Sequence, residues 1–141
     1  MTFFVRHFQW VMLVAGLLTC TMFYAAFAPI PAQQSNFGDA IEGPIAEVVV
    51  RNWGILIGLV GLMLIYGAFD VASRRLALLV AATSKIAFIA LVLVFGQELL
   101  EHQVGTSVIV DSIMVVLFVI YLVAVPLRSA SRRAAANTAA S

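Results

Sequence analysis

Residues 47–70 read EVVVRNWGILIGLVGLMLIYGAFD, and this stretch decides the class of the fold. After Arg51 it contains no charged residue until Asp70. A helix needs about 20 mainly apolar residues to cross a bilayer core roughly 30 Å thick, so the stretch is long enough to span a membrane. Comparable stretches occur elsewhere in the chain, and the sequence predicts four transmembrane helices, near residues 8–28, 45–69, 76–99 and 107–127.

The composition fits an integral membrane protein. Of the 141 residues, 63% are hydrophobic and 11% are charged, whereas soluble proteins carry roughly 25% charged residues. Because the connections between the apolar stretches are short, we expect an all-α protein whose four helices form one compact up-and-down bundle within residues 1–127. Residues 128–141 are predicted to form a mobile cytoplasmic tail. The net charge of +1 gives no indication of a nucleic-acid partner.

The first apolar stretch has two interpretations. Arg6 precedes it and the small residues Ala26 to Ala28 (AFA) follow near its end, which is the pattern of a cleaved secretory signal peptide. Its length, however, suits a membrane span better than the shorter apolar region of a signal peptide. We therefore expect a retained helix.

Charged residues predict the orientation of the bundle. Every acidic residue except Asp70 is predicted on the side of the bundle opposite the arginine-rich side. Because loops with an excess of lysine and arginine stay in the cytoplasm, we expect both termini to be cytoplasmic in a multi-pass protein of a bacterial inner membrane. Residues 29–44, which contain prolines and glycines, then form an outer loop. The arginines on the cytoplasmic side are Arg6, Arg74, Arg75, Arg128, Arg132 and Arg133.

Glycines mark one face of the predicted helix 45–69. Gly54, Gly58 and Gly61 fall on the same side of an α-helix. Small residues at such spacings let two transmembrane helices approach closely. We expect this face to pack within the bundle, while a homo-oligomer interface and a ligand groove are the alternatives.

Arg51 lies on the same side of that helix, near its outer end. A guanidinium stays charged and needs a carboxylate partner. Glu47 lies one turn away on the same helix, and Asp111 lies near the outer end of the fourth predicted helix. Either these groups form a structural ion-pair network, or Arg51 and Asp111 together form the polar mouth of a ligand pocket.

Lys85 lies near the middle of an apolar stretch. If its helix begins near residue 76, Lys85 is about 13 Å from the cytoplasmic end, too deep for its ammonium to reach the interface fully. Asp70 is the expected counter-ion, and Tyr66 lies in the same half of the membrane as a hydrogen-bonding group. Three roles stay open for Lys85, which are a snorkelled structural lysine, a contact to a ligand, and transfer of a proton or an ion.

The segment QELLEHQ at residues 97–103 is the one place where metal ligands come close in sequence. Glu98 and His102 share a helical face, and Glu101 lies beside them. The pattern lacks the His-Glu-x-x-His spacing of zinc proteases. We expect a solvated helix end and no metal site.

The stretches VVVRNWGILIGLVGLMLIYGAF and RRLALLVAATSKIAF resemble small four-helix bacterial inner-membrane proteins of the DoxX-like group. The resemblance covers roughly half of the chain and rests on Arg51, Trp53, the glycines, the arginine pair and Lys85. Some members of that group are linked to quinone-dependent sulfur oxidation or to redox partners. The resemblance therefore implies a lipid-like ligand or a quinone.

The predicted function is that of a small membrane accessory protein or a binding protein for a lipid-like ligand, with no catalytic residue assigned. The alternatives are a membrane subunit of a quinone-linked oxidoreductase, with Arg51 or Lys85 contacting a quinone carbonyl, and a small proton-coupled transporter that uses Lys85 and Asp70. Expected partners are the lipid bilayer, a membrane protein or a second copy of the chain.

Overall fold

The structure, a computed structural model, describes residues 2–125, with side chains from residue 7 onward. This part of the chain is helical without a strand, and four of its helices are long and apolar enough to cross a membrane. The elements in chain order are α1 (Thr2–Cys20), η1 (Thr21–Phe23), α2 (Tyr24–Phe27), α3 (Pro29–Phe37), α4 (Pro44–Phe69), α5 (Val71–Phe95), η2 (Gln97–Glu101) and α6 (Gln103–Ala124).

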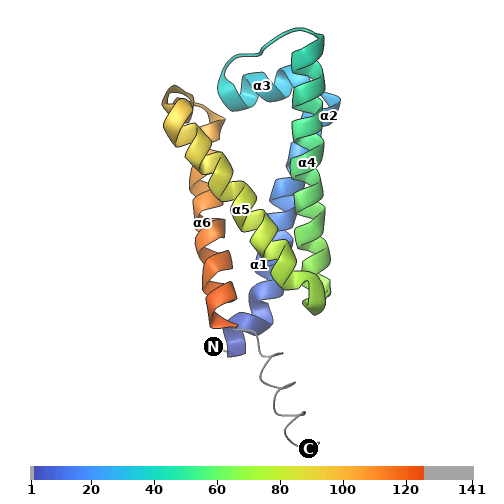
Figure 1. Ribbon diagram of the computed structural model, residues 1–141, viewed down its shortest axis with the longest axis vertical. Helices are drawn as coiled ribbons and strands as arrows, with labels where there is room; N and C mark the ends of the chain where they lie inside the picture. Colours follow the sequence, from blue (N-terminus) through green and yellow to red (C-terminus); the bar gives the residue numbers. More distant parts are fainter. Residues whose placement is uncertain (1, 126–141) are drawn as a thin grey trace, which may run out of the picture.

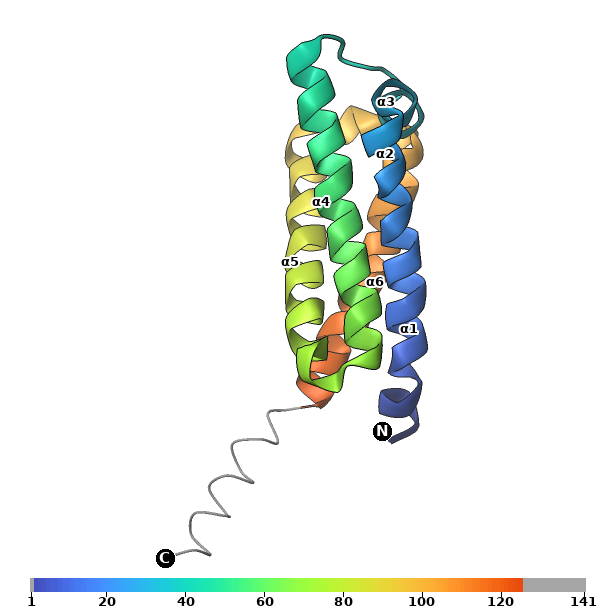
Figure 2. The same ribbon diagram turned by 90° about the vertical axis from the view of Figure 1, so that its right-hand side faces the viewer.

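The long helices form a ring in which each packs against its neighbours along the chain (Figure 1). The first span runs through α1, η1 and α2 from His7 to Phe27 and packs most extensively against α4. Helix α5 packs on α4 and α6 packs on α5, whereas α1 and α6 touch only slightly. Figure 2 shows the long helices side by side, with the start of α1 and the end of α6 at the same end of the bundle.

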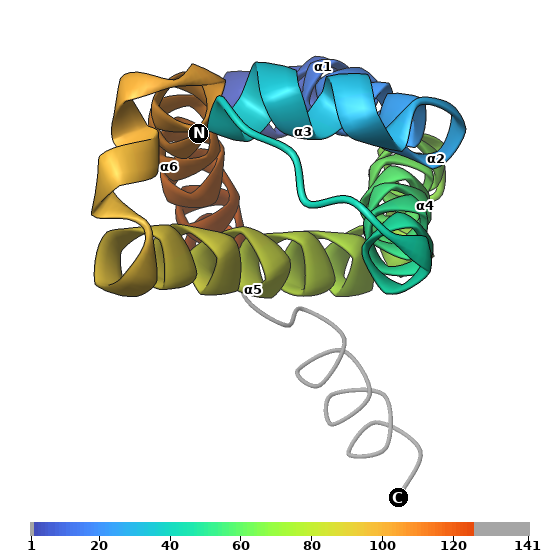
Figure 3. The same cartoon turned by 90° about the horizontal axis from the view of Figure 1, so that it is seen from above.

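Helix α3 lies across one end of the bundle, nearly perpendicular to the long helices, and contacts both α4 and α6. Figure 3 shows this end from above, with α3 along the side of the ring that α1 forms. We call it the α3 end, and the opposite end, where α4 turns into α5 at Asp70, the turn end.

Glycines allow α4 to pack closely against the first span. A Cβ atom on Gly58 would lie 2.6 Å from the Phe23 ring, and one on Gly61 would lie 2.7 Å from Sγ of Cys20. Gly54 is similarly enclosed by α2. The face predicted from the glycine spacing is therefore the contact between α4 and the first span.

Aromatic side chains fill the bundle at the turn end. The rings of Phe8 and Tyr121 stack with centroids 4.1 Å apart, and Phe118 meets Phe8 edge-on at 6.5 Å. Met12 and Leu64, both fully buried, complete this cluster. The turn half of the bundle is thus a packed core.

The connection between α4 and α5 is shorter than the sequence suggested. The Asp70 carboxylate caps α5 by accepting hydrogen bonds from the backbone amides of Ala72 and Ser73, at 3.2 and 3.1 Å, and from the Ser73 hydroxyl. Helix α5 therefore begins at Val71 instead of near residue 76. The Ser73 hydroxyl, followed by the Ala72 amide, lowers the pKa of Asp70 below its ordinary value of 3.8.

Two arginines cap helix ends at the turn end. Arg74 is buried and donates to the carbonyl oxygens of Gly67, at 3.0 Å, and Ala68, at 2.6 Å, in the last turn of α4. Arg75 donates to the carbonyl oxygen of Val125, just beyond α6, at 3.1 Å. Cations at these positions satisfy carbonyls that have no partner within their own helix.

The predicted outer loop is a helix over more than half of its length. Prolines are compatible with the first turn of a helix, and α3 begins at Pro29. It ends at Phe37 and is followed by Gly38, whose φ of 80° is left-handed and suits a glycine. The Phe37 ring lies 5.7 Å from Trp53 of α4, so the helix is held by packing that its sequence alone does not reveal.

The other helix boundaries also differ from those predicted. Helix α5 ends at Phe95, and the predicted continuation to residue 99 is part of the 3₁₀ helix η2. Helix α6 begins at Gln103 instead of near residue 107. The predicted end of the fourth helix at 127, the tail 128–141 and its three arginines lie outside the described residues.

Candidate ligand-binding site

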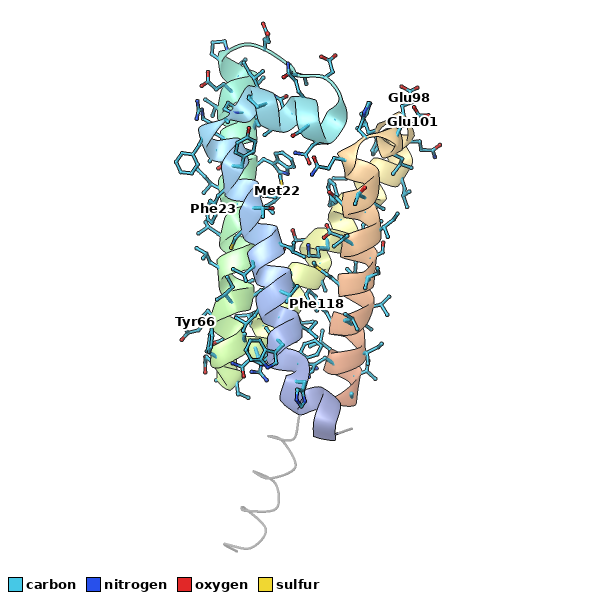
Figure 4. The ribbon with its side chains drawn as sticks, turned by 180° about the vertical axis from the view of Figure 1, so that it is seen from behind. Met22, Phe23, Tyr66, Glu98, Glu101 and Phe118 are labelled. Carbon is cyan, nitrogen blue, oxygen red and sulfur yellow. The ribbon has the colours of Figure 1, made fainter. Side chains whose placement is uncertain are left out.

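A cavity of about 310 Å³ lies among the long helices in the α3 half of the bundle. Figure 4 shows the first span and α6 in front of this region, with Met22 on the first span. Side chains from α1, η1, α3, α4, α5 and α6 line the cavity. Much of its wall is apolar or aromatic, including Met22, Phe37, Trp53, Ile57, Val60 and Phe88.

An ion pair between Lys85 and Asp111 forms part of the cavity wall. The ammonium of Lys85 donates directly to Oδ1 of Asp111. Lys85 is only 8% exposed although it lies near the middle of α5. Asp111 follows Gln103, the first residue of α6, by eight positions, which is about 12 Å along the helix. The cavity thus reaches from α3 to a pair of opposite charges deep inside the bundle.

Neutral polar side chains join this pair along the cavity. On α6, Gln103 and Ser107 line the cavity at intervals of four from Asp111, so the three share one face of the helix. Ser84 lies next to Lys85 on α5 and also lines the cavity. These residues were not identified from the sequence, although the spacing of Gln103, Ser107 and Asp111 is a visible signal. Further polar lining residues are Thr19, Thr21, Asn36 and Thr106.

The expected partner of Lys85 is corrected by this geometry. Asp70 caps α5 at the turn end, whereas Lys85 pairs with Asp111 of α6. The early start of α5 is the reason, because it places Lys85 about 21 Å along the helix instead of about 13 Å. At that depth the nearest carboxylate is that of Asp111, on the helix that begins at the α3 end.

One of the two interpretations placed Arg51 and Asp111 in the same site, but the structure places them apart. Its guanidinium donates to Oε1 of Glu47, at 3.0 Å from Nε and 2.6 Å from Nη2, and to the carbonyl oxygen of Ala26. It therefore caps the end of the first span. Arg51 and Glu47 line a separate, smaller cavity of about 220 Å³ beside α3.

Tyr66 also lies away from the larger cavity. Its side chain is exposed on the outer side of α4, as Figure 4 shows. It belongs to a belt of large apolar and aromatic side chains that faces away from the bundle and that lipid would cover. Tyr121, the other tyrosine of that half, accepts a hydrogen bond from Arg74 at 3.5 Å.

The acidic residues after α5 do not gather around a metal position. Glu98 and Glu101 are exposed at the α3 end, and the His102 ring packs against Gly38. Within the described part of the chain, no group of three or more His, Cys, Asp and Glu residues has the arrangement of a metal site.

Comparisons with protein-family models, with curated proteins and with solved structures found no match to this chain.

Proposed function

We propose that this protein is a membrane binding protein for a small lipid-like molecule, which it holds in the larger cavity between its helices. The observation that carries the proposal is a mainly apolar cavity that reaches the largely buried Lys85 and its ion-pair partner Asp111. Ligand sites in proteins are typically concave, mainly apolar and supplied with a few polar groups that orient the ligand. A volume of about 310 Å³ is at the lower end of the range for such sites, roughly 300–1,000 Å³.

The ion pair supports this proposal because it has a poor purely structural rationale. A buried pair often stabilises a protein no better than apolar side chains of the same volume. Charged residues inside a membrane are costly and commonly mark a ligand or ion pathway. Lys85 and Asp111 both border the cavity, so a ligand there has direct access to them.

The proposed orientation follows the positive-inside rule. Arg74 and Arg75 lie at the turn end, while the acidic residues Glu47, Glu98 and Glu101 lie at the α3 end. Both termini are then cytoplasmic, and the cavity lies in the outer half of a bacterial inner membrane. This arrangement lets a ligand enter from the outer leaflet or from the space outside.

Membership of the DoxX-like group belongs to the same proposal. It rests on the resemblance in α4 and α5, and it adds a quinone to the lipid-like molecules that suit the cavity. An accessory role beside another membrane protein, or in a homo-oligomer, is compatible with ligand binding and extends the proposal to a protein partner.

Two tryptophan substitutions on α6 test the proposal. Val110 lines the cavity, whereas Val116 is 57% exposed on the outer surface and is not a lining residue. After gentle purification from membranes, native mass spectra should show a retained small molecule on the unmodified protein and on Val116→Trp. Val110→Trp fills the cavity and should lose it. Equal retention by both variants, or no retained molecule on any of the three, contradicts the proposal.

A further inference from the structure

The cavity carries two formal charges, and they cancel. Lys85 and Asp111 are the only charged residues among those that line it in the described part of the chain. They are in direct contact. The remaining polar lining residues carry hydroxyl or amide groups, so the cavity has no net charge to offer a ligand.

Each member of the pair keeps hydrogen-bonding capacity. A lysine ammonium has three N–H donors and a carboxylate has two acceptor oxygens. One N–H of Lys85 donates to Oδ1 of Asp111. Among residues 7–125, neither side chain makes a second hydrogen bond. Their side chains retain 10% and 18% exposure, and both border the cavity. A donor and an acceptor therefore lie side by side at the cavity surface.

We propose that the ligand is an uncharged amphiphile whose head group accepts a hydrogen bond from Lys85 and donates one to Asp111. A primary amide and an alcohol both have this chemistry, and so does a quinol, whereas an oxidised quinone offers acceptors alone. The inference rests on the proposed function and specifies the ligand class for the same cavity. The apolar and aromatic walls, which include Trp53 and Phe88, receive the hydrocarbon part of the molecule.

Charged head groups are disfavoured by the pair itself. A carboxylate that approaches Lys85 also approaches the like charge of Asp111, and an ammonium that approaches Asp111 meets Lys85. Either ligand leaves one uncompensated charge in a poorly solvated interior, where the cost is far larger than in water. A neutral head group adds hydrogen bonds without changing the charge.

Three brominated probes of equal chain length test this selectivity, namely 8-bromooctanamide, 8-bromooctanoate and 8-bromooctylamine. Bromine quenches tryptophan fluorescence at short range, and Trp53 lines the cavity. The chain has two tryptophans, so in the Trp10→Phe variant all tryptophan fluorescence comes from Trp53. Trp10 is 65% exposed on the outer surface, so Trp53→Phe provides a second protein whose quenching reports the probe concentration in the surrounding lipid. Both proteins are measured in nanodiscs of zwitterionic lipid at neutral pH.

After correction for the lipid signal, the amide should half-quench Trp53 at a concentration about tenfold lower than the concentration that either charged probe requires. This ratio corresponds to a difference in binding free energy of about 1.4 kcal/mol. Stronger quenching by the carboxylate or the amine overturns the inference and leaves the proposed binding function intact. If none of the probes quenches Trp53 beyond the lipid signal, the binding function itself fails and the inference falls with it.

A charge substitution provides the second measurement. Asp111→Asn keeps the shape of the side chain but leaves Lys85 without a counter-charge, so the preference should move to the carboxylate probe. Asp39→Asn makes the same change in net charge in the exposed loop after α3, away from the cavity lining, and should keep the preference for the amide. An unchanged preference in Asp111→Asn contradicts the inference, and the comparison among the three probes on the unsubstituted pair stands even if this variant does not fold.

Discussion

At the scale of single residues, the ion pair of Lys85 and Asp111 couples α5 and α6 far from the turn end, where hydrogen bonds from Arg74 and Arg75 also link the two helices. The pair links α5 and α6 deep in the bundle, where neither charge is well hydrated. Removing one partner lowers the stability of the fold more than removing both, because the remaining charge then has no counter-charge.

A double-mutant cycle tests this coupling. Lys85→Met and Asp111→Asn should each lower the free energy of unfolding, by at most the roughly 3–5 kcal/mol that one unpaired charge costs in a fully buried site, because both side chains keep some exposure. The double variant should be less destabilised than the sum of the two. Unfolding of all four proteins is followed in the same mild detergent. Additive losses would show that the two side chains do not interact.

Asp70 is the second residue with a specific prediction. Because its pKa is lowered in the folded state, the charged form stabilises the fold at pH values above 3.8, and this contribution is lost as the pH falls through the lower folded pKa. Asp70→Asn keeps an acceptor but no charge. The stability difference between the two proteins should therefore shrink as the pH is lowered below 3.8. A difference that is independent of pH in thermal unfolding experiments contradicts the assignment.

Residue identities in the site were partly predictable. Lys85 and Asp111 stand out in the sequence because charges are rare in apolar stretches. Their pairing was not predicted, because it depends on the start of α5. The sequence favours Asp70 as a counter-ion, although its spacing to Ser73 also fits a helix cap, and that cap moves the start of α5 to Val71.

At the scale of the elements, the close contact between α4 and the first span depends on the missing side chains of its glycines. A Cβ on Gly61 would meet Sγ of Cys20 at 2.7 Å and the carbonyl oxygen of Gly16 at 2.8 Å. The backbone oxygen cannot move away without displacing α1.

Gly61→Ala should therefore destabilise the protein by about 1–3 kcal/mol through overpacking, although alanine favours an isolated helix by up to about 1 kcal/mol. Val48→Ile is the matched control, because it also adds one carbon atom to α4 but at an exposed position. Thermal unfolding of both variants measures the effect. A neutral or stabilising Gly61→Ala would show that the two helices have room to separate.

The glycine contact was predictable because small residues repeated on one face of a transmembrane helix mark a surface where another helix can approach closely. Helix α3 was not predictable. Its prolines and polar residues are typical of a loop, and its helical state depends on contacts that are remote in sequence, such as the packing of Phe37 on Trp53. The hydrogen bond from the amide of Ile41 to Oε1 of Gln33, at 3.2 Å, likewise ties the following loop back to α3.

At the scale of the whole molecule, the two halves of the bundle differ. The turn half is filled by the stacked rings of Phe8 and Tyr121 and by arginines that cap helix ends. The α3 half contains the cavity. Four apolar spans were predictable from length and composition, and a ligand pocket next to Asp111 was one of two interpretations of the sequence. The lining of the cavity was not predictable, because it depends on how the helices pack against one another.

The most direct test of a ligand cavity in this half is the reactivity of one introduced thiol. Ser107 lines the cavity near the α3 end, and Cys20 is the single native cysteine. In a Cys20→Ala background, Ser107→Cys should react with a membrane-impermeant thiol reagent added on the α3 side, and octanamide should slow the reaction. Glu98→Cys, exposed at the α3 end and outside the cavity lining, should react with the same reagent but should show no protection. Protection at Ser107→Cys alone is the predicted result, whereas a thiol there that octanamide, octanoate and octylamine all leave equally reactive would contradict a ligand site in the cavity.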